Sequence, residues 1–121
     1  RNENIRRLSF VGKVFSRNNV VCIMSAINPY ESLRNEIKER DKTSKLVYIK
    51  CPIDTLIKRD TKGLYARALL PDGDPRKVKN FTGISDPFEE PESADLIIDS
   101  RRESRREAID KLEKFILKSI S

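Results

Sequence analysis

Apolar residues recur along this chain in two different periods, and these periods predict alternating helices and strands. Ile5, Leu8, Val11 and Phe15 lie at helical spacing, which predicts an amphipathic helix over residues 1–18. Three later apolar runs are continuous, as in strands that are buried on both faces of a sheet. These predicted strands are residues 20–25, 46–51 and 96–98.

Three further segments predict helices. Residues 31–41 suit a short charged helix, and residues 53–60 and 103–119 suit helices with one apolar face, with a further helical turn over residues 63–70. We expect the inward positions to be Ile53, Leu56 and Ile57 in the second segment, and Ile109, Leu112, Phe115 or Ile116, and Ile120 in the last. Because strands alternate with helices, we expect an α/β fold with a parallel sheet, in a single domain over residues 1–121.

A long charged segment, approximately residues 62–91, fits none of these elements. Pro71, Gly73 and Pro75 break regular strand pairing there. A connection of this length in a compact domain is usually a lid, a binding loop or a disordered segment.

Cations and one aromatic residue suggest what this segment binds. The cations of this segment include Lys62, Arg76, Lys77 and Lys79. Phe81 lies beside Thr82 and Gly83, where the backbone can approach a ligand closely. We interpret the segment as a basic lid over a nucleotide, and a solvated surface loop fits the same features about equally well.

Two further groups of residues lie where a ligand could bind. Pro29 forces a turn after the first predicted strand and presents Asn28 and Tyr30 at its carboxyl end, the edge at which open α/β sheets bind ligands. Arg1 and Asn4 share one side of the first predicted helix, whose N-terminus favours an anion. A plain strand-to-helix turn and a frayed terminal arginine are the alternatives.

The composition limits the ligands and the catalytic groups that this chain can use. A net charge of +6 fits nucleic acid, a membrane surface or a phosphorylated small molecule. The chain has no histidine, so histidine-based acid–base catalysis is excluded, and its two thiols do not make a zinc site. Cys22 and Cys51 each fall in a predicted buried strand, as expected of small core residues in a reducing cytoplasm.

An arginine cluster precedes the last predicted helix. It consists of Arg101, Arg102, Arg105 and Arg106. Cations at a helix N-terminus oppose the helix dipole, so the cluster indicates either a solvated surface or an anionic partner. No recognised nucleic-acid motif accompanies it, and no apolar run is long enough to span a membrane. We therefore expect neither nucleic acid nor a membrane as partner.

Four phrases in a fixed order give a more specific signal. They are Arg1-Asn2-Glu3-Asn4-Ile5-Arg6-Arg7, Asn28-Pro29-Tyr30, Arg59-Asp60-Thr61-Lys62-Gly63-Leu64-Tyr65, and Phe81-Thr82-Gly83-Ile84 with Asp86-Pro87-Phe88-Glu89. With these phrases the chain resembles the adenylyl-sulfate kinase family, from residue 1 to about residue 100. That family phosphorylates the 3′-hydroxyl of adenosine 5′-phosphosulfate. The resemblance implies a three-layer P-loop kinase fold, with a five-stranded parallel sheet flanked by helices.

The resemblance also implies roles for individual residues. The implied substrate-binding residues are Arg1, Asn4, Ile27, Asn28, Lys62, Lys79, Asn80, Phe81 and Thr82. Phe81 would stack on the adenine, and Lys62 and Lys79 would close over the phosphosulfate, in keeping with aromatic and cationic chemistry. Arg59, Ser100 and Glu103 would lie near the adenine of ATP. ATP and Mg²⁺ are the implied cofactors, with no metal ligand assigned to this chain.

The chain departs from the family pattern in three ways. Asn28 stands where the family usually has a serine, and asparagine cannot carry a phosphate ester. The lid is several residues longer, through Leu70 to Pro75. The family's GxxxxGK[ST] phosphate loop and first strand have no counterpart here, so we expect an N-terminal part that carries them.

Three functional readings remain open. The first is an adenylyl-sulfate kinase in the cytoplasm, with adenosine 5′-phosphosulfate as substrate and a homodimer as a possible assembly. The second is a truncated, non-catalytic nucleotide-binding module, indicated by the missing phosphate loop. The third is a related P-loop kinase with a different acceptor, suggested by Asn28 and the longer lid.

Overall fold

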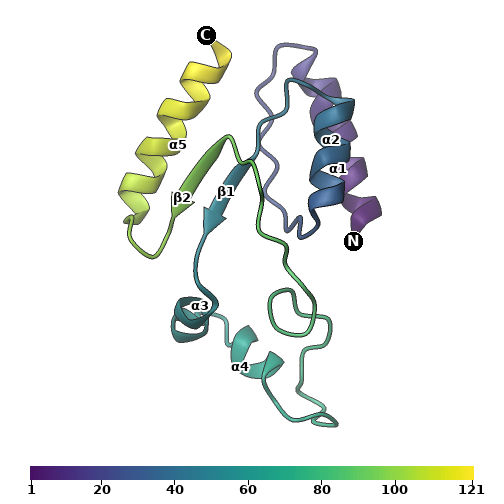
Figure 1. Cartoon of the computed structure of the whole chain (residues 1–121), viewed down its shortest axis with the longest axis vertical. Coiled ribbons are helices and arrows are strands. Elements are labelled where there is room, and N and C mark those ends of the chain that lie inside the picture. The colour runs from purple at the N-terminus through teal and green to yellow at the C-terminus, as the bar shows by residue number, and fades with distance from the viewer. The chain divides into compact units, whose positions relative to one another are not determined.

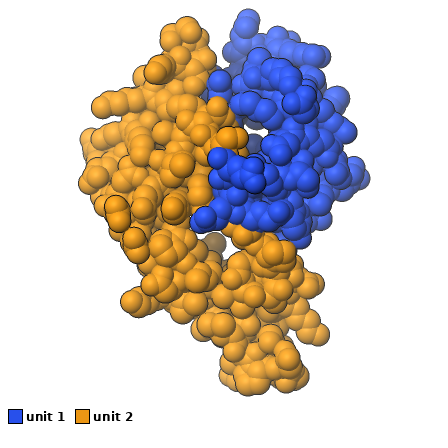
Figure 2. Space-filling model, in the orientation of Figure 1, with its two compact units in different colours: residues 1–45, 89–92 blue, residues 46–88, 93–121 orange.

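The computed structural model describes residues 1–121 and contains five helices and two strands. The chain divides into two compact units, which are coloured separately in Figure 2. Unit 1 comprises residues 1–45 and 89–92, and unit 2 comprises residues 46–88 and 93–121. The assignment of both units to one domain stays a prediction. No helix has both the length and the apolar character needed to cross a membrane.

Unit 1 contains α1 (Asn2–Ser16) and α2 (Glu31–Arg40), both where the sequence predicts a helix. Ile5 of α1 and Leu33 of α2 are each only 2% exposed and form its apolar centre. Arg6 joins the two helices, because its Nε and Nη2 donate to the two carboxylate oxygens of Glu36 at 3.0 and 3.1 Å. A forked pair of this kind fixes both position and orientation.

Residues 20–25 do not form the strand that their apolar character predicts. Val20, Val21, Ile23 and Met24 are 39 to 68% exposed, and Cys22 is exposed as well, so the expectation of a buried thiol there was wrong. A strand exists only where its backbone pairs with that of another strand, and the sheet of this structure contains β1 and β2 alone. Apolar composition indicates a preference for burial but does not provide a partner.

Unit 2 is built on two parallel strands, β1 (Val47–Lys50) and β2 (Leu96–Asp99). The register pairs Val47 with Leu96 and Lys50 with Asp99. Together with the helices, this small parallel sheet confirms the expected α/β class. Figure 1 shows α5 (Arg105–Ile120) running beside β2. Ile98 of β2 is buried at 2% exposure.

The short helices α3 (Ile53–Arg59) and α4 (Leu64–Ala68) also form where the sequence predicts them. The apolar faces that we expected to point inward on α3 and α5 are only partly covered. Ile53 and Ile57 are 41% and 36% exposed, and Ile109 and Ile120 of α5 are 53% and 59% exposed. A sheet of two strands offers too little surface to cover every apolar position on the helices around it.

The arginine cluster before α5 is solvent-exposed, and the helix start is stabilised locally. Ser104 is the N-cap, and its Oγ accepts a hydrogen bond from the Glu107 backbone N–H at 3.1 Å. Glu107 also places a negative charge in the first turn, where the helix dipole favours one. Arg102 and Arg106 lie 3.9 and 3.8 Å from the carboxylates of Asp99 and Asp110.

We predict that Glu36→Gln lowers the melting temperature of the natural full-length protein at neutral pH. The hydrogen bond from Arg6 lowers the pKa of Glu36. The ionised carboxylate therefore stabilises the fold above its unfolded-state pKa of about 4.3, and this contribution is lost as the pH falls through the lower folded-state pKa. Melting curves between pH 7 and pH 3 should show that the difference in melting temperature between wild type and Glu36→Gln shrinks toward pH 3.

Glu113→Gln on α5 is the matched control, because Glu113 is exposed and makes no ion pair. A Glu36→Gln difference that persisted unchanged to pH 3, or that Glu113→Gln reproduced, would show that the pairs of the Glu36 carboxylate with Arg6 and Arg40 are not responsible.

Candidate functional site

The lid begins at a turn that Asp60 holds in place. The Asp60 carboxylate accepts the backbone N–H groups of Tyr65 at 3.0 Å and Ala66 at 2.9 Å, and so satisfies two donors at the start of α4. Gly63 precedes the helix with a φ of 65°, a left-handed conformation that glycine adopts readily. Lys62 stands next to it with an exposed side chain.

The second fixed phrase of the lid forms a tight turn closed by backbone hydrogen bonds. The Phe81 carbonyl oxygen accepts from the N–H groups of Ile84 at 3.1 Å and Asp86 at 3.0 Å, and the Gly83 N–H donates to the Asp86 carbonyl at 2.7 Å. Gly83 has a φ of 90°, and a Cβ there would lie 3.4 Å from the Ile53 Cδ1 atom. Both features favour glycine at this position.

An aromatic contact brings the two phrases together. The rings of Tyr65 and Phe81 meet edge to face, with centroids 4.9 Å apart and planes at 76°. Burial raises the pKa of the Tyr65 hydroxyl, so this ring is neutral at physiological pH. Phe81 is half-buried and keeps part of its ring accessible. The contact therefore places the adenine-stacking candidate beside the segment that carries Lys62.

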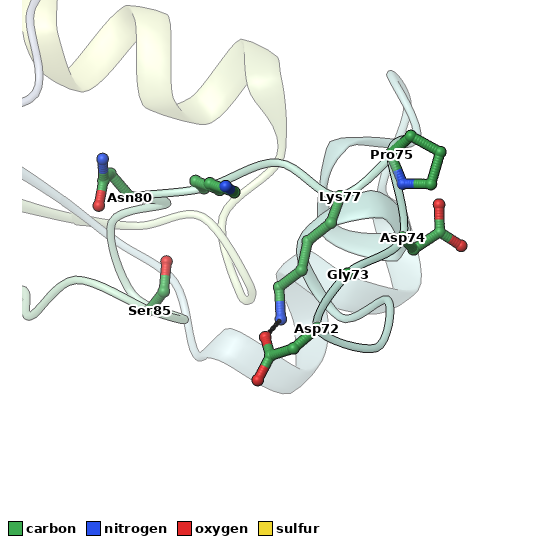
Figure 3. A pocket seen from close by; sticks show the side chains of 8 residues that line it. Asp72, Gly73, Asp74, Pro75, Lys77, Asn80 and Ser85 are labelled. Atoms are coloured by element: carbon green, nitrogen blue, oxygen red, sulfur yellow. Dashed lines mark hydrogen bonds and ion pairs between the residues drawn. The ribbon is translucent and has the colours of Figure 1, made fainter.

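The lid tip, residues 70–80, lines a pocket of about 550 Å³ together with Ser85. Figure 3 shows the Lys77 ammonium reaching the Asp72 carboxylate, at 2.7 Å. Arg76 is paired in the same way, because its Nη2 lies 2.9 Å from Asp74. The hydrogen bond from Lys77, and to a lesser extent the charge of Lys79, lowers the pKa of Asp72.

These pairs distinguish the four cations that the sequence singles out in the lid. Arg76 and Lys77 each form an ion pair with an aspartate of the lid itself. Lys62 and Lys79 are exposed and make no ion pair. They are therefore the lid cations best placed to meet an incoming anion.

Lys79 is followed by two residues whose backbone shapes the turn. Asn80 has a φ of 53°, in the left-handed region that asparagine tolerates better than most residues. Thr82 forms an isolated bridge with Asp86 across the turn. The four consecutive candidates from Lys79 to Thr82 thus lie on one short, well-defined segment.

The three residues expected near ATP come together at the carboxyl ends of β1 and β2. Arg59 closes α3 and donates through Nη2 to the Ser100 carbonyl oxygen at 2.9 Å. The Ser100 N–H and Oγ both donate to the Lys50 carbonyl, at 2.9 and 3.1 Å. The Glu103 carboxylate accepts from the Asp99 N–H at 2.6 Å and from Lys111 Nζ at 3.0 Å.

The Glu103 carboxylate is thus held by the protein itself. The hydrogen bond from Lys111, followed by that from the Asp99 N–H, lowers its pKa. Glu103 therefore stays ionised and fixes the turn between β2 and α5. Ser100 and Arg59 are the other two residues of this group, and their hydrogen bond shapes the sheet edge at the carboxyl ends of β1 and β2.

The remaining candidates belong to unit 1. Arg1 and Asn4 are exposed at the start of α1, where the Arg1 carbonyl accepts the Ile5 N–H at 3.1 Å. Ile27 is 60% exposed. Asn28 is half-buried, and its side-chain oxygen Oδ1 is buried without a hydrogen-bond partner in the protein. An unpaired buried acceptor is uncommon and calls for an explanation.

Sequence reasoning missed Arg34, which holds the turn that carries Asn28. Its Nε donates to the Asn28 carbonyl oxygen at 2.9 Å. A single arginine within a charged helix gives no sequence signal of burial, because its neighbours are mostly exposed polar residues.

The described residues contain no group of three or more histidine, cysteine, aspartate or glutamate side chains arranged to hold a metal ion. These residues therefore do not fit a resident metal centre of their own.

Comparison with known proteins identifies relatives of this chain. A family model described as adenylylsulphate kinase matches residues 1–99. The adenylyl-sulfate kinase of Picosynechococcus sp. is 37% identical over 114 residues, which cover 94% of this chain and 62% of that protein. The adenylyl-sulfate kinase of Halothermothrix orenii is 38% identical over 116 residues, which cover 96% of this chain and 60% of that protein.

A longer relative matches as well. The probable bifunctional SAT/APS kinase 2 of Sorangium cellulosum is 38% identical over 112 residues, which cover 93% of this chain and 18% of that protein. The chain thus spans about 60% of the length of the two curated single adenylyl-sulfate kinases.

We predict that Gly83→Ala loosens the turn from Phe81 to Asp86. An alanine at a φ of 90° is strained by roughly 1 to 2 kcal/mol, and its Cβ would press on Ile53. Amide hydrogen exchange should become faster at Gly83, Ile84 and Asp86, whose N–H groups close the turn.

Gly73→Ala is the control, because Gly73 has a nearly identical φ of 91° with nothing within 4 Å of its Cβ position. It should leave exchange in the 81–86 turn unchanged. Equal effects of the two variants on that turn would contradict the role assigned to Gly83.

Proposed function

The chain belongs to the adenylylsulphate kinase family, and from this premise we propose that the protein phosphorylates adenosine 5′-phosphosulfate. The 3′-hydroxyl oxygen attacks the γ-phosphorus of ATP, the bond to the β-phosphate oxygen breaks, and the hydroxyl proton is released. The products are ADP and 3′-phosphoadenosine 5′-phosphosulfate. The match over residues 1–99 carries this proposal.

In this proposal the residues that bind the acceptor nucleotide are Arg1, Asn4, Ile27, Asn28, Lys62, Lys79, Asn80, Phe81 and Thr82. The accessible part of the Phe81 ring stacks on the adenine, and Tyr65 keeps that ring in place. Lys62 and Lys79, which have no competing ion pair, meet the phosphate and sulfate charges.

ATP lies at the edge formed by Arg59 and Ser100. The Arg59 guanidinium is held by the Ser100 carbonyl, and a planar guanidinium stacks well on an aromatic base. These residues therefore fit an adenine. Glu103 supports the edge from within, through its bonds to Asp99 and Lys111.

Mg²⁺ is part of the proposal only as a companion of ATP. The residues of this chain do not fit a metal centre of their own. Phosphoryl transfer depends mainly on positioning and on charge stabilisation, and direct in-line transfer needs no phosphorylated protein residue. Asn28, which cannot carry a phosphate ester, is compatible with that route.

The proposal extends to the architecture and the setting of the whole protein. It includes a three-layer P-loop kinase fold with a five-stranded parallel sheet, of which β1 and β2 supply two strands. It also includes a cytoplasmic location and a homodimer as the possible assembly.

One observation favours a second candidate, a related kinase with a different acceptor. The lid tip carries its own ion pairs, Lys77 with Asp72 and Arg76 with Asp74. A tip organised in this way can shape the acceptor pocket differently from a shorter lid. A non-catalytic module that only binds the nucleotide is the remaining alternative.

Product analysis distinguishes these readings. The natural full-length protein is incubated with ATP, Mg²⁺ and either adenosine 5′-phosphosulfate or other nucleotides, and the products are separated by anion exchange. We expect 3′-phosphoadenosine 5′-phosphosulfate from the first mixture only. Phosphorylation of another nucleotide alone would favour the second candidate, and binding without turnover would favour the module.

We predict that Lys62→Ala and Lys79→Ala each raise the KM for adenosine 5′-phosphosulfate by about tenfold or more. A hydrogen bond to a charged group contributes about 1.5 to 3 kcal/mol, and about 1.4 kcal/mol corresponds to a factor of ten. Initial rates at varied acceptor concentration measure the effect. Lys114→Ala, which removes an exposed lysine of α5 that makes no ion pair, should leave the KM unchanged. A similar KM for all three variants would refute the lid assignment.

Arg59→Ala tests the ATP edge separately. We expect the KM for ATP to rise several-fold, because the stacking guanidinium is lost, while the KM for the acceptor stays near the wild-type value. Arg105→Ala removes an exposed arginine of α5 and serves as the control. An unchanged KM for ATP in the Arg59 variant would exclude Arg59 from the site.

A further inference from the structure

Arg34 is the one charged residue in the buried set of this protein, at 6% exposure. It lies in α2, and its guanidinium donates hydrogen bonds to three acceptors. Nε donates to the Asn28 carbonyl oxygen at 2.9 Å, and Nη1 donates to the Glu31 carboxylate at 2.5 Å. Nη2 donates to the Glu89 carbonyl oxygen. One carboxylate and two backbone carbonyls thus compensate the buried charge, as burial requires.

Further bonds reinforce the same turn. The Glu89 N–H donates to the Pro29 carbonyl at 2.8 Å, and the Glu89 carboxylate accepts the Glu31 N–H at 3.3 Å. Pro29 itself is fully buried. The turn from Asn28 to Glu31 is therefore joined to Glu89, which lies near the end of the lid segment. All of these residues belong to unit 1.

The side chain of Asn28 contrasts with its backbone. Arg34 holds the Asn28 carbonyl, but the side-chain oxygen Oδ1 is buried and has no partner in the protein. A buried acceptor without a donor is unfavourable, and a ligand N–H or O–H can relieve it. The Arg34 guanidinium donates to the backbone carbonyl of Asn28 and makes no hydrogen bond to its Oδ1. It therefore acts on the ligand through Asn28.

We propose that Arg34 is a positioning residue for the acceptor nucleotide, because it fixes the Asn28 turn so that Oδ1 accepts a hydrogen bond from that nucleotide. The donor is an amino or hydroxyl group of a nucleoside phosphate. This inference rests on the proposed function and adds to it a residue that makes no contact with the ligand. Through the Glu89 carbonyl, Arg34 also ties the same turn to the end of the lid segment.

The test uses Arg34→Lys in the natural full-length protein. A lysine keeps the charge but lacks the planar fork that serves three acceptors at once. We expect the KM for adenosine 5′-phosphosulfate to rise about tenfold, with kcat and the KM for ATP within about twofold of wild type. Arg40→Lys on the same helix is the matched control, because the Arg40 side chain is 67% exposed. It should behave as wild type.

A double-mutant cycle with Asn28→Ala separates positioning from general support of the fold. If Arg34 acts through Asn28, the effects of the two substitutions on the KM for adenosine 5′-phosphosulfate overlap. The KM of the double variant is then little higher than that of Asn28→Ala alone. Full additivity of the two losses would overturn the proposal. So would an equal rise in both KM values, which general damage to the fold would cause.

Glu31→Gln provides a second variant if Arg34→Lys does not fold. It removes the charged partner of Arg34 and retains both carbonyl acceptors, so the same selective rise in the acceptor KM is expected. An unchanged acceptor KM in every folded variant, with an active wild-type enzyme, overturns the positioning role alone. A wild-type protein that neither binds nor phosphorylates adenosine 5′-phosphosulfate overturns both this inference and the proposed function.

Discussion

The parallel pairing of β1 with β2 is the interaction on which the lid-bearing unit depends. It brings Lys50 and Asp99 to the same edge, and the Ser100 N–H continues the pairing by donating to the Lys50 carbonyl. α3 leaves this edge from one strand and α5 leaves it from the other, so Arg59 reaches Ser100. The loops that carry the candidate residues are therefore attached to a regular backbone scaffold, as is usual for binding sites.

Within that unit, the lid is organised by short-range contacts. Asp60 holds the start of α4, Gly83 permits the tight turn, and the Tyr65–Phe81 contact joins the two. The result is an aromatic ring held in place on a segment that also carries two lysines without an ion pair. Aspartates of the lid tip form ion pairs with Arg76 and Lys77, whereas Lys62 and Lys79 make none.

Much of this could be predicted from the sequence, because the deciding signals are local. Helical spacing located α1, α3 and α5, and continuous apolar runs located β1 and β2. The same rule failed at residues 20–25, because a strand needs a backbone partner and sequence does not record one. The lid motifs were visible, but their ring contact and the internal ion pairs of the tip depend on tertiary geometry. Arg34 could not be found at all, since its burial follows from the packing of a turn against Glu89.

Hydrogen exchange of the turn from Phe81 to Asp86, with and without adenosine 5′-phosphosulfate, tests the central claim most directly. If the lid binds this nucleotide, its addition to the natural full-length protein slows exchange of these amides in proportion to occupancy, while the exposed C-terminal end of α5 is unchanged. The result that contradicts the account is an unchanged exchange rate in this turn at nucleotide concentrations that saturate the enzyme.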